Sequence, residues 1–83
     1  MTFVVYILYS ISIDKYYVGH TDDIERRLTE HNTGQTRYTS SRGNPWKLVY
    51  QENYPSRSLA IKKEREIKAQ KSRKYIENLI ATL

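Results

Sequence analysis

Residues 3–19 of the chain read FVVYILYSISIDKYYVG. The first seven are β-branched, aliphatic or aromatic, and the last four return to this chemistry after a polar break. Two such runs joined by a short polar segment predict a β-hairpin. With the turn centred between Ile11 and Ser12, Tyr6 lies directly opposite Tyr17 on the same face of the sheet. The sequence therefore predicts a hairpin that sets two tyrosines side by side.

A short helix is predicted directly after the hairpin. Thr21-Asp22-Asp23 offers N-cap residues, Ile24 and Leu28 supply an apolar stripe, and the helix is expected to end near residues 32–34. Residues 33–45 contain Thr, Ser, Gly, Asn and Pro but no aliphatic residue, so we expect a surface loop there.

The rest of the chain predicts one strand and two helices. Trp46–Tyr54 has the composition of a third strand. Ser56 or Ser58 starts a helix that runs to about Gln70, and Ser72 can cap a final helix. The order ββαβαα indicates an α+β fold with a small three-stranded, mainly antiparallel sheet flanked by helices.

Size and composition limit the possible classes of protein. A chain of 83 residues supports one modest core, so we expect a single domain over residues 1–83. The hydrophobic content of 39% and charged content of 28% exclude a disordered chain and a membrane protein. With no Cys and two His, cysteine nucleophiles and thiolate zinc sites are excluded. No secretory signal is recognisable, so we expect a cytoplasmic protein with no membrane partner.

Positive charge is concentrated in the last third of the chain. The formal net charge is +5, and residues 57–74 hold eight Lys or Arg and two Glu. Such a segment is either a phosphate-binding surface or the solvated face of a helix. The candidates for binding nucleic acid in this segment are Lys62, Lys63, Arg65, Lys68, Lys71, Arg73 and Lys74.

Two pairs of side chains in the first half could carry chemistry. The phenols of Tyr6 and Tyr17 can hold a water or a phosphate oxygen between them, or serve simply as amphipathic packing. Arg27 and His31 are spaced i,i+4 and share a helix face beside the apolar stripe. A guanidinium there can bind a phosphate and an imidazole can exchange protons near neutral pH.

Arg27, His31 and Glu64 could also have purely structural roles. Arg27 can pair with Asp23 or Glu30, and His31 can close the helix C-terminus. Glu64 occupies a position in its helix where an apolar side chain is expected. It can form a salt bridge to Lys68, or serve as a single ligand of a Mg²⁺ ion that otherwise keeps its waters and takes phosphate oxygens.

Four segments in order resemble the GIY-YIG nuclease family. Val5-Tyr6-Ile7 and Tyr17-Val18-Gly19 stand where the family has its two tripeptides, and residues 17–32 resemble its hairpin-to-helix segment. Residues 45–50 and 60–68 look like its third strand and its metal-binding helix. The resemblance covers nearly the whole chain, and it implies a small stand-alone nuclease domain.

The resemblance also implies roles for particular residues. Its catalytic set falls on Tyr6, Tyr17, Arg27, His31 and Glu64, with Glu64 as the metal ligand and Mg²⁺ or Mn²⁺ as cofactor. Val5 replaces the first Gly of the family tripeptide. His20 follows the second tripeptide, where some DNA-repair relatives have Lys, and it joins the candidates for nucleic-acid binding. Asn78 is not included in the catalytic set because its position does not match securely.

The resulting hypothesis is a divalent-metal-dependent DNA endonuclease that acts in DNA repair or processing. Tyr6 would accept the proton of the attacking water or orient it, Tyr17 would position water or phosphate, and Arg27 would neutralise the phosphate. No sequence-reading module is appended, so we expect a structure-selective or weakly sequence-selective enzyme, with a homodimer or a partner protein supplying target selection. The alternative is a non-catalytic nucleic-acid-binding module that uses the basic helix 57–74.

Overall fold

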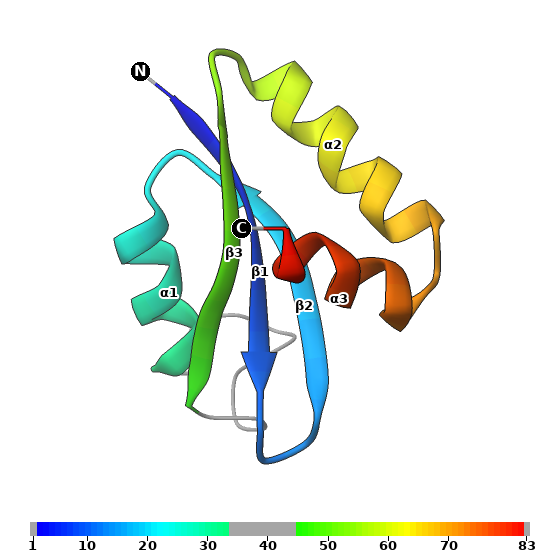
Figure 1. The fold of residues 1–83 in the computed structure, drawn as a ribbon. Coiled ribbons are helices and arrows are strands. Elements are labelled where there is room, and N and C mark those ends of the chain that lie inside the picture. The colour runs from blue at the N-terminus through cyan, green and yellow to red at the C-terminus, as the bar shows by residue number, and fades with distance from the viewer. Residues whose placement is uncertain (1, 34–44, 83) are drawn as a thin grey trace.

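The computed structural model describes residues 2–33 and 45–82 of the chain. Figure 1 shows three strands and three helices in the order ββαβαα, which confirms the predicted α+β class. The elements are β1 (Phe3–Ser10), β2 (Lys15–Thr21), α1 (Ile24–Asn32), β3 (Trp46–Tyr54), α2 (Arg57–Ala69) and α3 (Arg73–Ala81). Most of the loop predicted over residues 33–45 lies outside the described residues.

The sheet has the strand order β2-β1-β3, and β1 pairs antiparallel with both neighbours. Because β1 is central, its side chains are buried on both faces, which explains its almost continuously apolar sequence. Helix α1 covers one face, and α2 and α3 cover the other (Figure 1). Strand β2 forms one edge of this three-layer arrangement.

Two apolar clusters hold the layers together. On the α1 face, Val4, Tyr6 and Leu8 of β1 pack with Trp46 and with the stripe residues of α1. On the opposite face, Val5 and Ile7 pack with residues of α2 and α3. The alternation of β1 residues between the two clusters follows from the two-residue period of a strand. None of the helices in the described residues is long and apolar enough to span a membrane.

Polar side chains fix the helix starts. Asp23, Ser56 and Ser72 are the N-caps of α1, α2 and α3, and each accepts a hydrogen bond from the backbone N–H three residues ahead. The sequence left the cap of α1 open among three residues, and the structure selects the last of them. Likewise, Ser56 rather than Ser58 caps α2.

The predicted hairpin register is wrong by two residues. Tyr6 lies opposite Gly19, and Tyr17 lies opposite Leu8. The turn contains four residues, 11–14, because a two-residue turn would require a positive φ at Ile11, which a β-branched residue disfavours. Asp14 takes the positive φ instead, at 52°. A shift of two residues preserves the side-chain face, so Tyr6 and Tyr17 still share one face of the sheet.

Candidate active site

The hydroxyl of Tyr6 is the centre of a cluster on the α1 face of the sheet. Tyr6 is 1% exposed, and its ring lies across Gly19 of the neighbouring strand. A Cβ atom built on Gly19 would lie 2.7 Å from the Tyr6 Oη and 2.8 Å from its Cζ. Glycine at position 19 therefore makes room for the phenol to reach over β2.

Helix α1 supplies two partners for this hydroxyl. The Tyr6 Oη lies 3.0 Å from His31 Nε2, and Arg27 Nε donates to the same oxygen at 3.4 Å. The i,i+4 spacing of Arg27 and His31 places both side chains toward the sheet, as the sequence predicts. Arg27 Nη1 also donates to Glu30 at 3.1 Å, so the ion pair considered as an alternative is present as well.

Tyr17 completes the cluster from the edge strand. Its ring centroid lies 6.3 Å from that of Tyr6 and 4.7 Å from that of His31, in an edge-to-face arrangement with the imidazole. Tyr17 is half-buried, whereas His31 is completely buried. A substrate at this site would therefore touch Tyr17 and Arg27, and His31 could act only through Tyr6.

Burial sets the proton affinities of the pair at the centre. Burial raises the pKa of Tyr6 to about 12, although the hydrogen bond from Arg27 opposes the shift. Burial, with the positive charge of Arg27, lowers the pKa of His31 to about 4. At neutral pH, Tyr6 is a phenol and His31 a neutral imidazole. With Nε2 as the acceptor, the Tyr6 hydroxyl donates to His31 while its oxygen accepts from Arg27.

Glu64 lies on the other side of β2. Its Oε1 is 2.7 Å from His20 Nδ1, and Lys68 Nζ donates to its Oε2 at 2.8 Å. Burial alone would raise the pKa of the Glu64 carboxyl, but the hydrogen bonds of Lys68 and His20 outweigh burial and lower that pKa below its usual range. The side chain of Glu64 is 17% exposed and carries a negative charge at neutral pH.

The two groups are connected through the edge strand. Gly19 and His20 are neighbours in β2, so they face opposite sides of the sheet, Gly19 toward Tyr6 and His20 toward Glu64. The negative charge of Glu64 contributes, as the weakest of several causes, to the raised pKa of Tyr6. The structure thus gathers Tyr6, Tyr17, Arg27 and His31 around one hydroxyl and holds Glu64 within electrostatic range across β2. That all five act on one substrate stays a prediction.

The donor set at Glu64 fits a weakly held divalent cation. Among residues 2–33 and 45–82, no cluster of three or more His, Cys, Asp or Glu side chains could hold a metal ion alone. Mg²⁺ commonly binds through one carboxylate, several waters and the phosphate oxygens of a substrate. Glu64 can supply that carboxylate, in competition with His20 and Lys68. The residues therefore fit a metal ion that is held jointly with the substrate.

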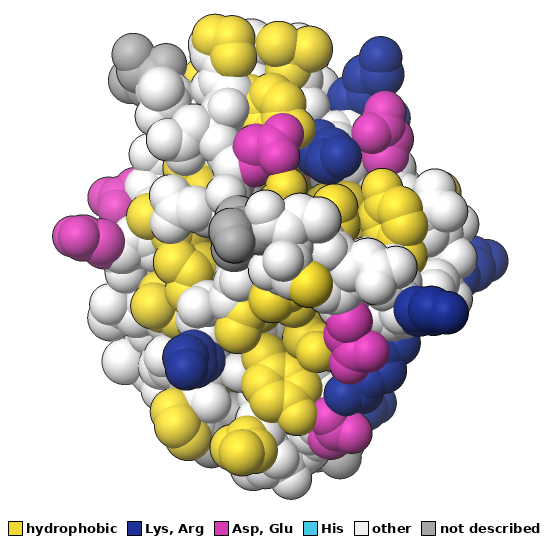
Figure 2. Space-filling view, viewed as in Figure 1, with side chains coloured by type: hydrophobic (Ala, Val, Ile, Leu, Met, Phe, Trp, Pro, Cys, Tyr) yellow, Lys and Arg dark blue, Asp and Glu magenta, His cyan; other side chains and the backbone are white. Residues whose placement is uncertain are grey.

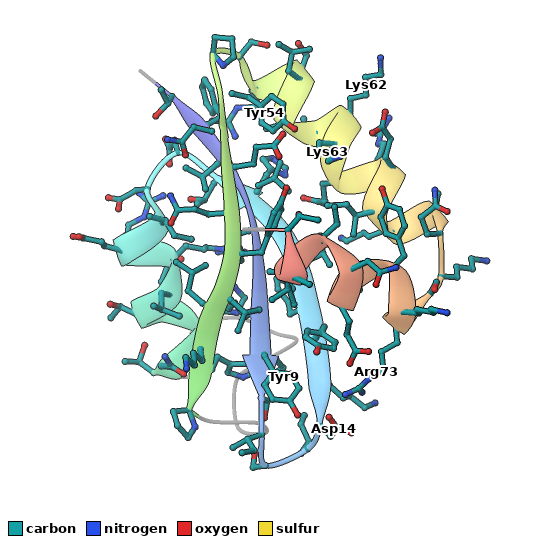
Figure 3. The ribbon with its side chains drawn as sticks, in the orientation of Figure 1. Tyr9, Asp14, Tyr54, Lys62, Lys63 and Arg73 are labelled. Carbon is teal, nitrogen blue, oxygen red and sulfur yellow. The ribbon has the colours of Figure 1, made fainter. Side chains whose placement is uncertain are left out.

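The basic residues predicted to bind nucleic acid do not share one surface. Lys62 and Arg65 line a hollow on the outer side of α2, and Figure 3 shows Lys62 pointing away from the molecule. Lys63 lies toward Tyr54 of β3. The pKa of Glu52 is lowered by the hydrogen bonds of Tyr50 and Tyr54, and the charge of Lys63 adds the weakest contribution.

The remaining basic candidates lie near the corner between α2 and α3. Lys68, Lys71 and Arg73 line a groove there, while Lys74 is exposed on α3. Arg73 is bound by Asp14 and by Glu77. The side chain of Asn78, which was considered for the site, is exposed on α3.

One important contact had no signal in the sequence. His20 and Glu64 are 44 residues apart, and the hydrogen bond between them arises only when α2 packs against β2. The Lys68 contact was foreseeable from its i,i+4 spacing to Glu64. His20 is a partner of the candidate metal ligand in this structure, and its binding to nucleic acid stays a prediction.

The fold and the tyrosine–histidine–arginine cluster together define a class of small α+β domains, and comparison with known proteins identifies it. The sequence matches the GIY-YIG catalytic domain over residues 2–76, and the chain therefore belongs to the GIY-YIG family, a family of nucleases.

Several relatives are small UPF0213 proteins. One from Natronomonas pharaonis is 41% identical over 78 residues, which are 93% of this chain and 88% of the relative. Another, from Haloquadratum walsbyi, is 44% identical over 78% of this chain and 72% of its own length. The solution NMR structure of a UPF0213 protein from Bacillus halodurans is 36% identical, with a TM-score of 0.62, and the match covers 99% of this chain and 85% of that one.

Proposed function

We propose that this protein is a cytoplasmic, divalent-metal-dependent DNA endonuclease that acts in DNA repair or processing and selects its substrate by structure more than by sequence. The observation that carries the proposal is the shared hydroxyl of Tyr6. His31 and Arg27 both bind it, and the Glu64 carboxylate acts on it electrostatically from across β2. Packing alone would not require a cation, an imidazole and a carboxylate around one phenol.

The Tyr6–His31 pair supplies a route for the proton of an attacking water. A phenol with a pKa of about 12 is a poor base, but the neutral imidazole of His31 can accept the phenol proton as Tyr6 takes a proton from water. A tyrosinate–imidazolium pair would lie well above the neutral pair in free energy, because burial raises the pKa of Tyr6 and lowers that of His31. The two proton transfers would therefore accompany attack on phosphorus and would not precede it.

Charges on the exposed side of the site would bind the phosphodiester. Among the described residues, Arg27 hydrogen-bonds only Tyr6 and Glu30, and its side chain is 34% exposed. It can turn N–H groups toward a phosphate oxygen while keeping its contact with Tyr6. Glu64 would hold the divalent cation, which supplies positive charge for the leaving oxygen. Tyr17, at the edge of the site, would position the phosphate or the water.

A cleavage assay on defined substrates tests the proposal. Single-stranded, blunt duplex, flapped and branched DNA, with RNA counterparts, are incubated with and without Mg²⁺ or Mn²⁺. We expect metal-dependent cleavage of DNA that favours particular structures, and its loss in the Arg27→Ala variant. The matched control is Arg65→Ala on the outer side of α2, which removes the same charge away from the site.

Binding without cleavage would favour the alternative function. A module that only binds nucleic acid needs positive charge, and the groove between α2 and α3 supplies it. If all substrates remain intact under every metal condition while DNA is bound, the nuclease proposal fails and the binding module replaces it.

A further inference from the structure

A groove runs along the free edge of β2, next to the proposed active site. It has a volume of about 740 Å³ and lies between β2, the end of α2 and the start of α3. One wall consists of Asp14 in the turn and residues 15–18 of β2. Because β2 is an edge strand, the backbone groups on its outer edge are not paired with another strand of this sheet. Ile67 and Ile76 form the apolar part of the opposite wall.

Cationic side chains surround this apolar interior. Lys15, Lys68, Lys71 and Arg73 line the groove, and Asp14 is the single acidic residue among its lining residues. Asp14 is already bound by Arg73. In the part of the chain that the structure describes, Lys15 and Lys71 take part in none of the ion pairs. Figure 2 shows Lys and Arg side chains along the side formed by α2 and α3, with Asp and Glu side chains between them.

The backbone at both walls has an unusual conformation. Asp14 and Lys71 are the non-glycine residues with positive φ among those described, at 52° and 48°, and both line this groove. Lys71 follows α2 at a position where helices usually have Gly or Asn. Among the described residues, Lys71 therefore places at the groove wall an ammonium group that takes part in no ion pair.

Two lining residues of the groove contact residues of the proposed active site. Tyr17 lines the groove and packs against His31, and Lys68 lines it and binds Glu64. A nucleic-acid strand whose phosphate lies at Arg27 could therefore continue into the groove. The volume suits one or two nucleotides, whereas a duplex, whose major groove alone is about 12 Å wide, is too large to enter.

We propose that this groove binds an unpaired nucleotide of the substrate strand next to the cleaved phosphodiester, and this inference rests on the proposed nuclease function. Base and sugar would contact the two isoleucines and the two tyrosines that line the groove. Base edges would hydrogen-bond the strand edge, and Lys15 and Lys71 would bind phosphates. The preferred substrates would then be those that present a single-stranded segment, such as a flap or an overhang.

Binding of a short single strand tests the groove independently of cleavage. The affinity of the protein for fluorescent five-nucleotide oligo-dT and for a blunt duplex is measured without metal. This binding assay does not depend on cleavage activity. The Lys15→Gln/Lys71→Gly variant removes both unpaired ammonium groups, and glycine at 71 suits the positive φ, so the fold is expected to hold. Lys62→Gln/Lys74→Gln is the control, because it removes equal charge outside the groove.

We expect the groove variant to bind oligo-dT at least about fivefold more weakly, with a salt slope lower by about 0.7 for each phosphate that the variant no longer neutralises. The control variant should change the affinity for oligo-dT less than about twofold, and blunt duplex should respond equally to the two variants. Equal losses of oligo-dT affinity in both variants, or no saturable binding of oligo-dT, would overturn the proposal. Equal cleavage of blunt and flapped DNA would also overturn it while leaving the nuclease function in place.

Discussion

The Tyr6 Oη lies 3.0 Å from His31 Nε2 and joins the central strand to helix α1 inside the core. Both residues are almost completely buried, so the contact does two things. It satisfies two polar groups that are shielded from bulk solvent in the free protein, and it gives the phenol a proton acceptor that no substrate contacts. Stability and the proposed chemistry therefore depend on the same pair.

Removing the Tyr6 oxygen should lower both the stability of the protein and its rate of cleavage. In Tyr6→Phe, the hydrogen bond between Tyr6 and His31 is lost and Arg27 loses one acceptor, so we expect the free energy of unfolding to fall by about 1–3 kcal/mol. Cleavage should fall by about 10²-fold or more, because the proton route is removed. Urea unfolding and single-turnover cleavage measure the two effects. Tyr16→Phe, which removes an exposed hydrogen bond to Glu77, should change neither much.

His31 should make the protein less stable in mild acid. Its pKa is lowered to about 4 in the folded state, against about 6.5 in the unfolded chain. Above pH 6.5 it is neutral in both states, and its full contribution is present. As the pH falls toward 4, the unfolded chain binds a proton that the folded chain does not, so stability decreases with falling pH. The loss should reach about 2 kcal/mol at pH 5.

Two histidine variants separate this effect from others. Urea unfolding at pH 7.5 and pH 5 should show the loss in His20→Gln as in the parent protein, because His31 is intact. His31→Gln should show much less of it. Carboxyl groups ordinarily titrate near pH 4, so they contribute little in this range. A loss of the same size in His31→Gln would contradict the assignment.

Gly19→Ala should displace Tyr6. The new methyl group would lie under 3 Å from two atoms of a buried ring that has no room to move aside. We expect a loss of about 1–3 kcal/mol in stability and about 10²-fold in cleavage, because the phenol leaves its position. The Tyr6→Leu background removes both close atoms, so Gly19→Ala should cost much less stability there. Equal costs in the two backgrounds would show that the backbone at Gly19, not the phenol, requires glycine.

The sequence predicts local features of this protein better than contacts between distant elements. The strands, the helices and the face shared by Arg27 and His31 follow from composition, caps and the helical period. The hairpin register was missed by two residues because it depends on a turn conformation at Asp14 that no glycine signals. Because the register shift is two residues, an even number, Tyr6 and Tyr17 remain on one face of the sheet, and the predicted site is preserved.

Other features of the site depend on packing. The pairing of His20 with Glu64 requires α2 to lie against β2, and the shifted pKa values of Tyr6 and His31 require their burial. Neither the His20–Glu64 pairing nor the shifted pKa values can be inferred from the spacing of residues in the sequence. The basic segment likewise looks like one charged face in the sequence, yet its residues point to different sides because they lie around helix α2 and on both sides of the corner at Lys71.

Glu64 distinguishes an enzyme from a binding module. Glu64→Gln keeps the shape of the side chain but removes the charge that would hold a divalent cation. We expect metal-dependent cleavage to fall by about 10²-fold or more, because the leaving oxygen loses its counter-charge, while DNA affinity is retained. An inward-facing carboxylate without partners would cost stability. The structure gives it two partners and a lowered pKa, so the substitution should instead destabilise the fold by about 0–1 kcal/mol.

The control and the measurement for Glu64 come from the same helix. Glu66→Gln removes an equal charge on the outer side of α2, and its cleavage should match that of the parent protein. Cleavage rate, DNA affinity and thermal midpoint are measured on both variants, with Mg²⁺ titrated from low to high concentration. A Glu64→Gln protein that recovers its full rate at high Mg²⁺ would show that Glu64 contributes affinity for the ion and that other groups, including the substrate phosphate, suffice to hold it. Unchanged cleavage at every Mg²⁺ concentration would remove Glu64 from the metal site, and its pairing with His20 and Lys68 would then be its whole role.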